Sequence, residues 1–199
     1  MLLGLEYLDL AILLFSSFLG SLMTAALGVG GGAFLITVMA EILPPLALIP
    51  VHGLVQLGSN GSRAVLTRKH TQWQKVVWFL GGAIVASVVS VMFLQHFDTD
   101  WIPLVIAFFI LWLCWGPIPE IGLGTTRSGL FSGGAVTTLA SMLVGASGPL
   151  VSAWLGAKNA ERWTYTANFA TCMTLQHGLK LERVDLCCTC SNQPTLVTT

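Results

Sequence analysis

The chain has 199 residues, of which 54% are hydrophobic and only 9% are charged, and its mean hydropathy is +0.79. Soluble domains usually carry about 25% charged residues, so this composition excludes an ordinary water-soluble globule. The formal net charge is zero and no large basic cluster is present, which argues against a nucleic acid as a partner. We therefore expect an all-α, polytopic membrane protein in contact with the lipid bilayer.

A transmembrane helix needs about 20 apolar residues. We expect about six spans on this basis. They are Leu8–Leu27 extended across a glycine break by Ala33–Leu43, then Leu46–Leu66, Val76–Phe97, Trp101–Trp115, Ser128–Leu155 and Trp163–Leu179. The pair Pro44-Pro45 separates the first two spans, and Gly116–Glu120 forms a loop.

Glycine-rich stretches interrupt the first and the fifth span, at residues 28–32 and 145–149. A helix broken inside a membrane exposes free N–H groups and the positive end of a helix dipole, which favours an anion. Broken helices of this kind form substrate sites in transporters. The alternative is close helix packing, because Gly28 and Gly32 form a G-x-x-x-G pair. The stretch alone leaves both interpretations open.

A shift of 117 residues superposes Gly28 on Gly145 and Gly31 on Gly148. This match predicts two repeats, each of which opens with a glycine-broken helix. The first, residues 1–125, has four spans, and the second, residues 126–180, is incomplete with two. Residues 181–199 form a non-membrane tail, which is either genuine or the result of a truncation or a frameshift.

The basic residues predict the orientation, because cytoplasmic loops are enriched in Lys and Arg. The loop with Arg68, Lys69 and Lys75 is expected in the cytoplasm. Arg127, Lys180 and Arg183 then lie on the same side, whereas Lys158 and Arg162 lie outside. Under this topology both termini are cytoplasmic and the two repeats point the same way. The protein is expected in the cell membrane, which is the inner membrane in a Gram-negative bacterium.

Polar side chains occupy one face of the second span, where His52, Gln56 and Asn60 are spaced four residues apart. Asn168 and Gln176 continue this pattern in the sixth span, next to His177. Such faces either line a substrate path or form hydrogen bonds between helices. Arg63 and Lys180 end the two helices. They are interpreted either as anchors that reach the membrane interface or as cations that attract anions to a cavity mouth.

No Asp or Glu lies in the middle of any predicted span, which argues against a cation carrier. Proton coupling through His52 or His177 remains an open alternative. No H-E-x-x-H or paired-aspartate pattern is present, so we expect no enzyme and no catalytic residues. We also expect no cofactor and no metal, because the three tail cysteines lack an evident fourth ligand.

The stretch Leu27–Gly32, the apolar run and prolines after it, and the segment Pro50–Arg63 resemble the sulfite exporter TauE/SafE family. The resemblance continues in the basic loop before Gln72-Trp73 and in a second copy at Gly145–Leu150 and Thr166–Lys180. It covers residues 8–180. It implies a carrier with seven or eight helices that exports small organic or sulfur-containing anions, such as sulfite or sulfoacetate.

The resulting hypothesis is a secondary transporter that exports small anions, sulfite or organosulfonates, by alternating access. The alternative is an inactive truncated protein or an accessory membrane subunit of the same fold. The expected substrate-binding residues lie at the two breaks and on the two polar faces. They are Gly28, Gly30, Gly31, Gly32, His52, Gln56, Asn60, Arg63, Gly145, Ser147, Gly148, Asn168, Gln176 and His177. The sequence predicts neither the oligomeric state nor the coupling ion.

Overall fold

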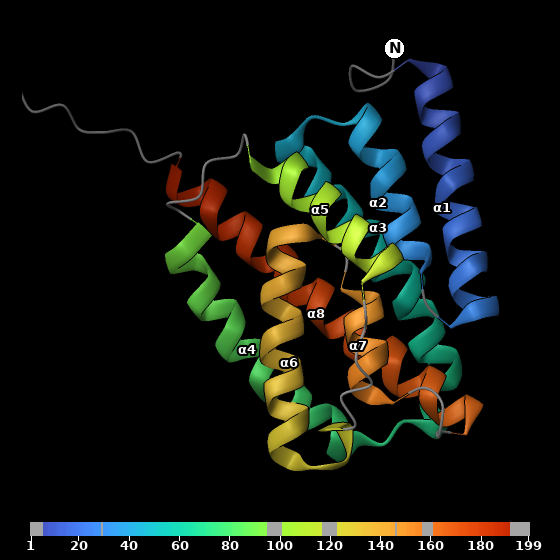
Figure 1. Cartoon of the computed structure of the whole chain (residues 1–199), viewed down its shortest axis with the longest axis vertical. Coiled ribbons are helices and arrows are strands. Elements are labelled where there is room, and N and C mark those ends of the chain that lie inside the picture. Colours follow the sequence, from blue (N-terminus) through green and yellow to red (C-terminus); the bar gives the residue numbers. More distant parts are fainter. Residues whose placement is uncertain are drawn as a thin grey trace, which may run out of the picture.

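The computed structural model describes residues 6–28, 30–94, 101–116, 123–145, 147–156 and 161–191, and all secondary structure in these ranges is helical (Figure 1). The α-helices are α1 (Tyr7–Leu27), α2 (Gly31–Ile42), α3 (Pro45–Thr67), α4 (Trp73–Leu94), α5 (Ile102–Trp115), α6 (Arg127–Val144), α7 (Gly148–Leu155) and α8 (Arg162–Ser191). Two short 3-10 turns are η1 (Arg68–His70) and η3 (Leu123–Thr125). The all-α prediction is confirmed.

Two of the described helical stretches are long and apolar enough to cross a membrane by themselves. They are α1 and the segment Trp73–Ser90 of α4, with mean hydropathies of 2.0 and 1.3. Several predicted features lie outside the described residues. These are Val29, the end of the third span at residues 95–97, most of the loop Gly116–Glu120, Ala146, Lys158 and the last eight residues of the tail.

Each glycine break turns the chain back on itself. Gly31 packs so tightly against α1 that a Cβ there would collide with the Gly20 carbonyl oxygen and the Thr24 hydroxyl group. The α2 helix therefore runs antiparallel to α1 (Figure 1). The α7 helix likewise folds back on α6, where Trp154 donates from Nε1 to the Gly129 carbonyl oxygen at 2.7 Å. The two interrupted spans are thus helical hairpins, each with a short second helix, which corrects the prediction of interrupted but continuing spans.

The helix boundaries recur at the shift of 117 residues. The helices α1 and α6 end at Leu27 and Val144, α2 and α7 begin at Gly31 and Gly148, and α3 and α8 begin at Pro45 and Arg162. Gly28 and Gly145 follow the first helix of each hairpin in the same left-handed conformation, with φ of 83° and 81°. That region of φ strongly favours glycine, so both turns depend on this residue type.

The two related units nevertheless point in opposite directions. The helices α3 and α8 correspond at this shift, yet they run antiparallel, with Gly53 beside Lys180 and Gly61 beside Thr174. The prediction of parallel repeats is therefore wrong. The physical reason is that the hairpin of α1 and α2 adds one reversal of the chain. Five described helices therefore precede α6, and an odd number of reversals makes α6 run opposite to α1.

The predicted side of the membrane is also wrong for Arg162. The ring of Trp163, next to Arg162, stacks on the His70 ring with a centroid distance of 6.0 Å, and Arg127 lies 5.6 Å from the centroid of the Trp78 ring. The start of α8 therefore lies at the same end of the bundle as the basic loop, and Arg162 is not on the opposite side. We call this the basic end. The first turn of α1 lies at the other end (Figure 1).

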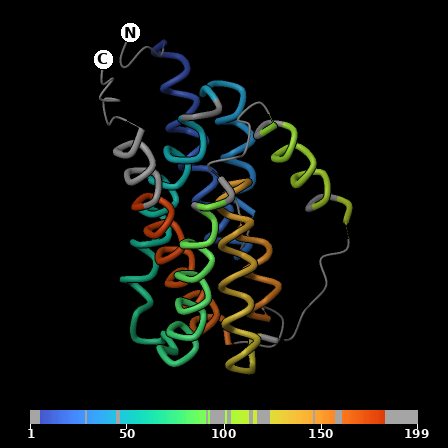
Figure 2. The backbone as a smooth tube through the Cα atoms, turned by 90° about the vertical axis from the view of Figure 1, so that its left-hand side faces the viewer, coloured from blue at the N-terminus to red at the C-terminus, as the bar shows by residue number. Residues whose placement is uncertain are grey.

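The packing between α4 and α6 is unusually close. A Cβ at Gly82 would collide with the Phe131 carbonyl oxygen, and a Cβ at Gly134 would collide with the Phe79 carbonyl oxygen. Small residues that let two backbones approach in this way are typical of helix packing in membranes. Figure 2 shows the long helices side by side, with α5 at the outer edge of the bundle.

The outer surface of the bundle is apolar, as a lipid environment requires. On α1, the side chains of Leu14, Phe15 and Phe18 are each more than 60% exposed. The interior instead contains polar residues, among them His52, Asn60, Gln176 and Lys180. This distribution, apolar outside and polar inside, positions a polar site at the centre of the bundle.

Candidate functional site

A small cavity of about 20 Å³ lies where the two glycine breaks face one another. It is lined by residues of the two breaks and of the helices α1, α3 and α8. The lining residues are Thr24, Gly30, Gly32, Ala33, His52, Gln56, Asn60, Ser147, Gly148, Pro149, Phe169, Met173 and His177. This volume holds about one water molecule. We call it the central cavity.

The polar face of α3 borders this cavity as the spacing of its residues predicts. His52 donates from Nε2 to the Gly32 carbonyl oxygen at 3.0 Å, so it connects α3 to the first break. Asn60 donates from Nδ2 to both oxygens of Gln56, the backbone carbonyl and the side-chain Oε1, at 3.0 Å each. The other polar atoms, His52 Nδ1 and Asn60 Oδ1, are buried without a hydrogen-bond partner among the described residues.

His177 is the least satisfied polar side chain of the cavity. It is fully buried, and neither of its ring nitrogens has a hydrogen-bond partner in the described part of the chain. Its ring lies edge-on to the His52 ring, with centroids 6.0 Å apart. A buried polar group without a partner is costly, which is typical of a site that binds a ligand or water.

Gln176 has a structural role that the sequence pattern did not separate from binding. Its Nε2 donates to the hydroxyl groups of Thr137 and Thr138 on α6 at 2.7 and 2.8 Å. Its Oε1 accepts from Ser147 Oγ at 3.0 Å. Gln176 therefore holds the second break against α6 and does not line the cavity.

Lys180 is buried beside the second break. Its side chain is 1% exposed, and Nζ donates to the Gly145 carbonyl oxygen at 3.1 Å. The sequence suggested that Lys180 ends a helix. In the structure, α8 continues beyond it to Ser191. The interpretation as an anchor at the membrane interface is wrong for this residue. Arg63 is half-buried and lines neither of the two hollows described here.

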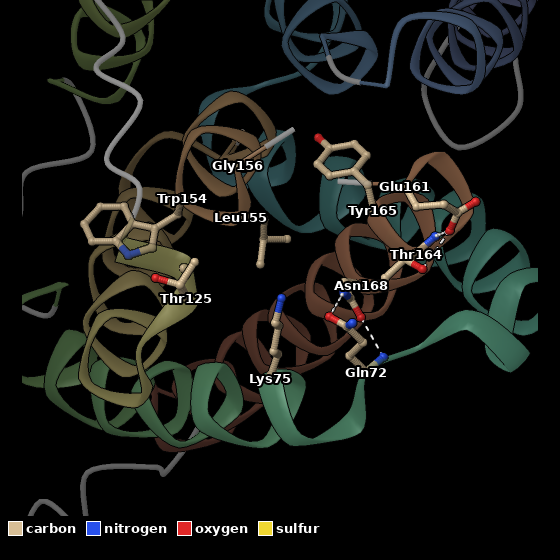
Figure 3. A pocket seen from close by; sticks show the side chains of 11 residues that line it. Gln72, Lys75, Thr125, Trp154, Leu155, Gly156, Glu161, Thr164, Tyr165 and Asn168 are labelled. Atoms are coloured by element: carbon tan, nitrogen blue, oxygen red, sulfur yellow. Dashed lines mark hydrogen bonds between the residues drawn. The ribbon is translucent and has the colours of Figure 1, made fainter. Parts of the chain in front are cut away.

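A larger hollow of about 460 Å³ lies at the basic end, and we call it the vestibule (Figure 3). It is lined by the start of α4, η3, the end of α7 and the start of α8. Its residues are Gln72, Lys75, Gly124, Thr125, Trp154, Leu155, Gly156, Glu161, Thr164, Tyr165 and Asn168. The Lys75 side chain points into this space (Figure 3), where a cation would attract anions.

Asn168 lies in the vestibule and not in the central cavity. Its Oδ1 accepts from the Gln72 backbone N–H at 2.8 Å, and its Nδ2 donates to Gln72 Oε1 at 3.2 Å (Figure 3). These bonds hold α8 to the start of α4. The predicted polar face of the sixth span is thus divided. Asn168 faces the vestibule, Gln176 faces α6, and His177 faces the central cavity.

Glu161 is the one acidic side chain among the described residues that line the two hollows. It caps the start of α8, where Oε2 accepts from the side chain and the backbone of Thr164 at 2.7 and 2.8 Å. These hydrogen bonds, together with one from the Trp163 backbone, lower the pKa of Glu161 below its usual 4.5. The carboxylate is therefore directed to the helix N-terminus, which stabilises its negative charge.

An aromatic pair on α8 lies between the two hollows. The rings of Tyr165 and Phe169 stack with centroids 5.8 Å apart. Tyr165 lines the vestibule and donates from its hydroxyl group to Ser152 Oγ at 2.8 Å, whereas Phe169 lines the central cavity. The sequence reasoning missed this pair, although two aromatic residues four positions apart on a polar helix are a detectable signal.

The glycines of the breaks have different roles. Gly31 serves close packing against α1, as described above. Gly30, with φ of 102°, and Gly32, whose Cβ would lie 3.0 Å from Gln56 Nε2, border the central cavity. Gly148 also borders it, and a Cβ there would meet only Phe169 at 3.7 Å. Gly31 thus fits the interpretation of close helix packing, whereas Gly30, Gly32 and Gly148 border a cavity, where a substrate site stays a prediction.

Among the described residues, no group of three His, Cys, Asp or Glu side chains is placed to hold a metal ion. The family model described as sulfite exporter TauE/SafE matches residues 13–176 of the chain. The matched range includes both breaks, every lining residue of the central cavity except His177, and the whole vestibule. Searches of curated proteins and of solved structures found no match.

Proposed function

Because the chain belongs to the sulfite exporter TauE/SafE family, we propose that it is a secondary transporter that exports small anions, sulfite or organosulfonates, by alternating access. The family consists of membrane transporters. The proposed binding site is the central cavity. The proposed location is the cell membrane, with several spans.

The observation that carries the proposal is that both glycine breaks open onto one cavity. The helices α2 and α7 begin there, and the first N–H groups of a helix have no partner within that helix. Their dipoles also bring partial positive charge to the cavity. No Asp or Glu lines it, so nothing among the described residues there competes with an anion.

The size of the two hollows supports alternating access. The central cavity has room for about one water molecule, which is too small for sulfite, whereas the vestibule is large enough for a small organic anion. An anion that reaches the vestibule from the basic end would need the Tyr165–Phe169 pair to move before it could enter. The described conformation then corresponds to a state whose site is closed.

Flux into proteoliposomes tests the proposal directly. Purified protein is reconstituted, and uptake of radiolabelled sulfite or sulfoacetate is compared with uptake of radiolabelled sodium. We expect saturable uptake of at least one anion and no uptake of sodium above protein-free vesicles. Transport of sodium without any anion would contradict the charge argument. No transport at all by a folded protein would favour the alternative of an inactive or accessory subunit.

A variant of the cavity connects transport to the site. Gly148→Leu places a bulky side chain in the central cavity, where only Phe169 is near, so we expect flux to fall to background while the protein stays folded. The matched control is Gly58→Leu, because Gly58 is exposed on α3 and a Cβ there has open space. Unchanged flux in Gly148→Leu would exclude the central cavity as the binding site.

A further inference from the structure

Lys180 is a buried cation whose role in the site is not explained by packing. Its side chain is almost fully buried on α8, one turn beyond His177, and its ammonium group donates one described hydrogen bond, to the Gly145 carbonyl oxygen. An ammonium group has three N–H donors, so two remain without a described protein partner. Gly145 itself is the residue that ends α6 at the second break.

Among the side chains that the structure describes, none supplies a compensating negative charge to Lys180. The titratable side chains that face this region are His52 on α3 and His177 on α8, and both are bases. The described residues of the two breaks, of α6 and of α7 include no Asp or Glu, and Glu41 of α2 is exposed. Removing one partner of a buried ion pair is strongly destabilising, because the remaining charge is left without compensation. A buried lysine in basic surroundings is in that situation, unless a mobile anion supplies the counter-charge.

We propose that Lys180 is the residue that supplies the positive charge of the anion site. In the closed state its ammonium group binds the Gly145 carbonyl oxygen. When an oxyanion enters the central cavity beside Ser147, the flexible lysine side chain turns from that carbonyl oxygen to the anion. The inference rests on the function proposed above and adds the charged group that the cavity lining lacks.

The chemistry of the site limits the ligand class. One ammonium group and the N–H groups of two helix starts suit a compact oxyanion with one or two negative charges. Neighbouring His177 has no described partner for either ring nitrogen, and the one that carries the proton can donate a further hydrogen bond to the same oxygens. Sulfite is the probe that matches this description and the family.

The test compares Lys180→Gln with Lys180→Arg and with the control Lys69→Gln. Lys69 is an exposed lysine at the basic end, so its loss removes the same charge from a different place. We expect the KM for sulfite to rise about 10- to 100-fold in Lys180→Gln, as for the loss of a charged hydrogen bond. Lys180→Arg should keep part of the affinity, and Lys69→Gln should match the unmodified protein.

A binding measurement separates this inference from the transport proposal. Sulfite should raise the melting temperature of the detergent-solubilised protein and of Lys69→Gln, but not that of Lys180→Gln. Without sulfite, Lys180→Gln should melt no lower than the unmodified protein, because it removes an uncompensated charge. A lower melting temperature with an unchanged KM would assign Lys180 a structural role and overturn the inference.

The remaining outcomes are also decisive. Stabilisation by sulfite that depends on Lys180, in a protein that shows no flux, would support the site and overturn the transport proposal. Flux of sulfite with the same KM in Lys180→Gln and in the unmodified protein would do the reverse. Absence of both flux and stabilisation would overturn both proposals.

Discussion

At the residue scale, a glycine in a membrane helix has a role that depends on what its missing Cβ would touch. Gly31 faces backbone atoms of α1 that cannot move aside, whereas Gly148 faces one aromatic ring at an ordinary contact distance. The two residues are equivalent by the sequence shift, yet their surroundings differ. Their substitutions should therefore have different effects.

We expect Gly31→Ala to lower the stability of the protein by about 1–3 kcal/mol, the usual cost of overpacking a close contact. Gly148→Ala should fold with nearly unchanged stability, since its methyl group has room. Thermal unfolding in detergent, followed by circular dichroism, measures the difference. Equal melting temperatures for the two variants would contradict the tight α1–α2 contact.

Glu161 should make the stability of the protein depend on pH. Its pKa is lowered in the folded protein by hydrogen bonds, first of all from the Thr164 side chain. Because the pKa is lower in the folded than in the unfolded protein, the carboxylate stabilises the fold at a pH above its pKa in the unfolded protein. This stabilisation is lost as the pH falls through the pKa in the folded protein. We expect Glu161→Gln to melt lower than the unmodified protein at pH 7.

A comparison of Glu161→Gln with the unmodified protein at low pH is the control. Below the folded pKa of Glu161, which lies under 4.5, the difference in melting temperature should disappear. Melting curves at pH 7 and at the lowest pH where both proteins stay soluble measure this change. A difference that stays constant with pH would show that the cap acts without its charge.

At the scale of elements, α4 and α6 pack closely against each other through Gly82 and Gly134. Each glycine faces a backbone carbonyl of the other helix, so even a methyl group forces the helices apart. We expect Gly82→Ala and Gly134→Ala each to reduce the yield of monodisperse protein in size-exclusion chromatography. Gly58→Ala is the matched control, since its Cβ has open space, and it should leave the yield unchanged or raise it.

The positions of the helices could largely be predicted from the sequence, but their directions could not. Prolines, glycines and apolar runs locate the breaks and the start of α3, because these residue types determine local backbone conformation. After a break the chain can continue in the same direction or reverse into a hairpin. Which of the two occurs depends on tertiary contacts, such as that between Gly20 and Gly31. Hydropathy does not record such contacts, so the hairpins were missed.

The candidate site shows the same division. The face formed by His52, Gln56 and Asn60 was predictable, because residues four apart share a side of a helix. The burial of Lys180 was not, because it depends on the continuation of α8 through a polar segment that could not be distinguished from a tail. The separation of Asn168 from His177 was also not predictable, since it depends on the contact of Asn168 with Gln72.

At the scale of the whole molecule, the sidedness in the membrane can be tested. The basic end carries the loop with Arg68 and Lys69, and the enrichment of cytoplasmic loops in basic residues predicts that this end faces the cytoplasm. Because α1 starts at the other end, we expect Glu6 outside (Figure 1). This differs from the cytoplasmic N-terminus predicted from the sequence, because α1 and α2 are two antiparallel helices in place of one span.

Single cysteines at the two positions, in a background without other reactive cysteines, test this arrangement. A membrane-impermeant maleimide should label Glu6→Cys in intact cells and Lys69→Cys only after permeabilisation. Labelling of both from the same side would require a different path for α1 through the membrane.

The opposite direction of the two units has a consequence for thermodynamics. Two breaks in units of opposite direction approach the central cavity from both sides, so their arrangement does not by itself fix a direction of transport. A passive carrier built in this way would transport its substrate in either direction. Net export would then be a property of the concentration difference and the membrane voltage that the cell maintains, and reversing those gradients in vesicles should reverse the flow.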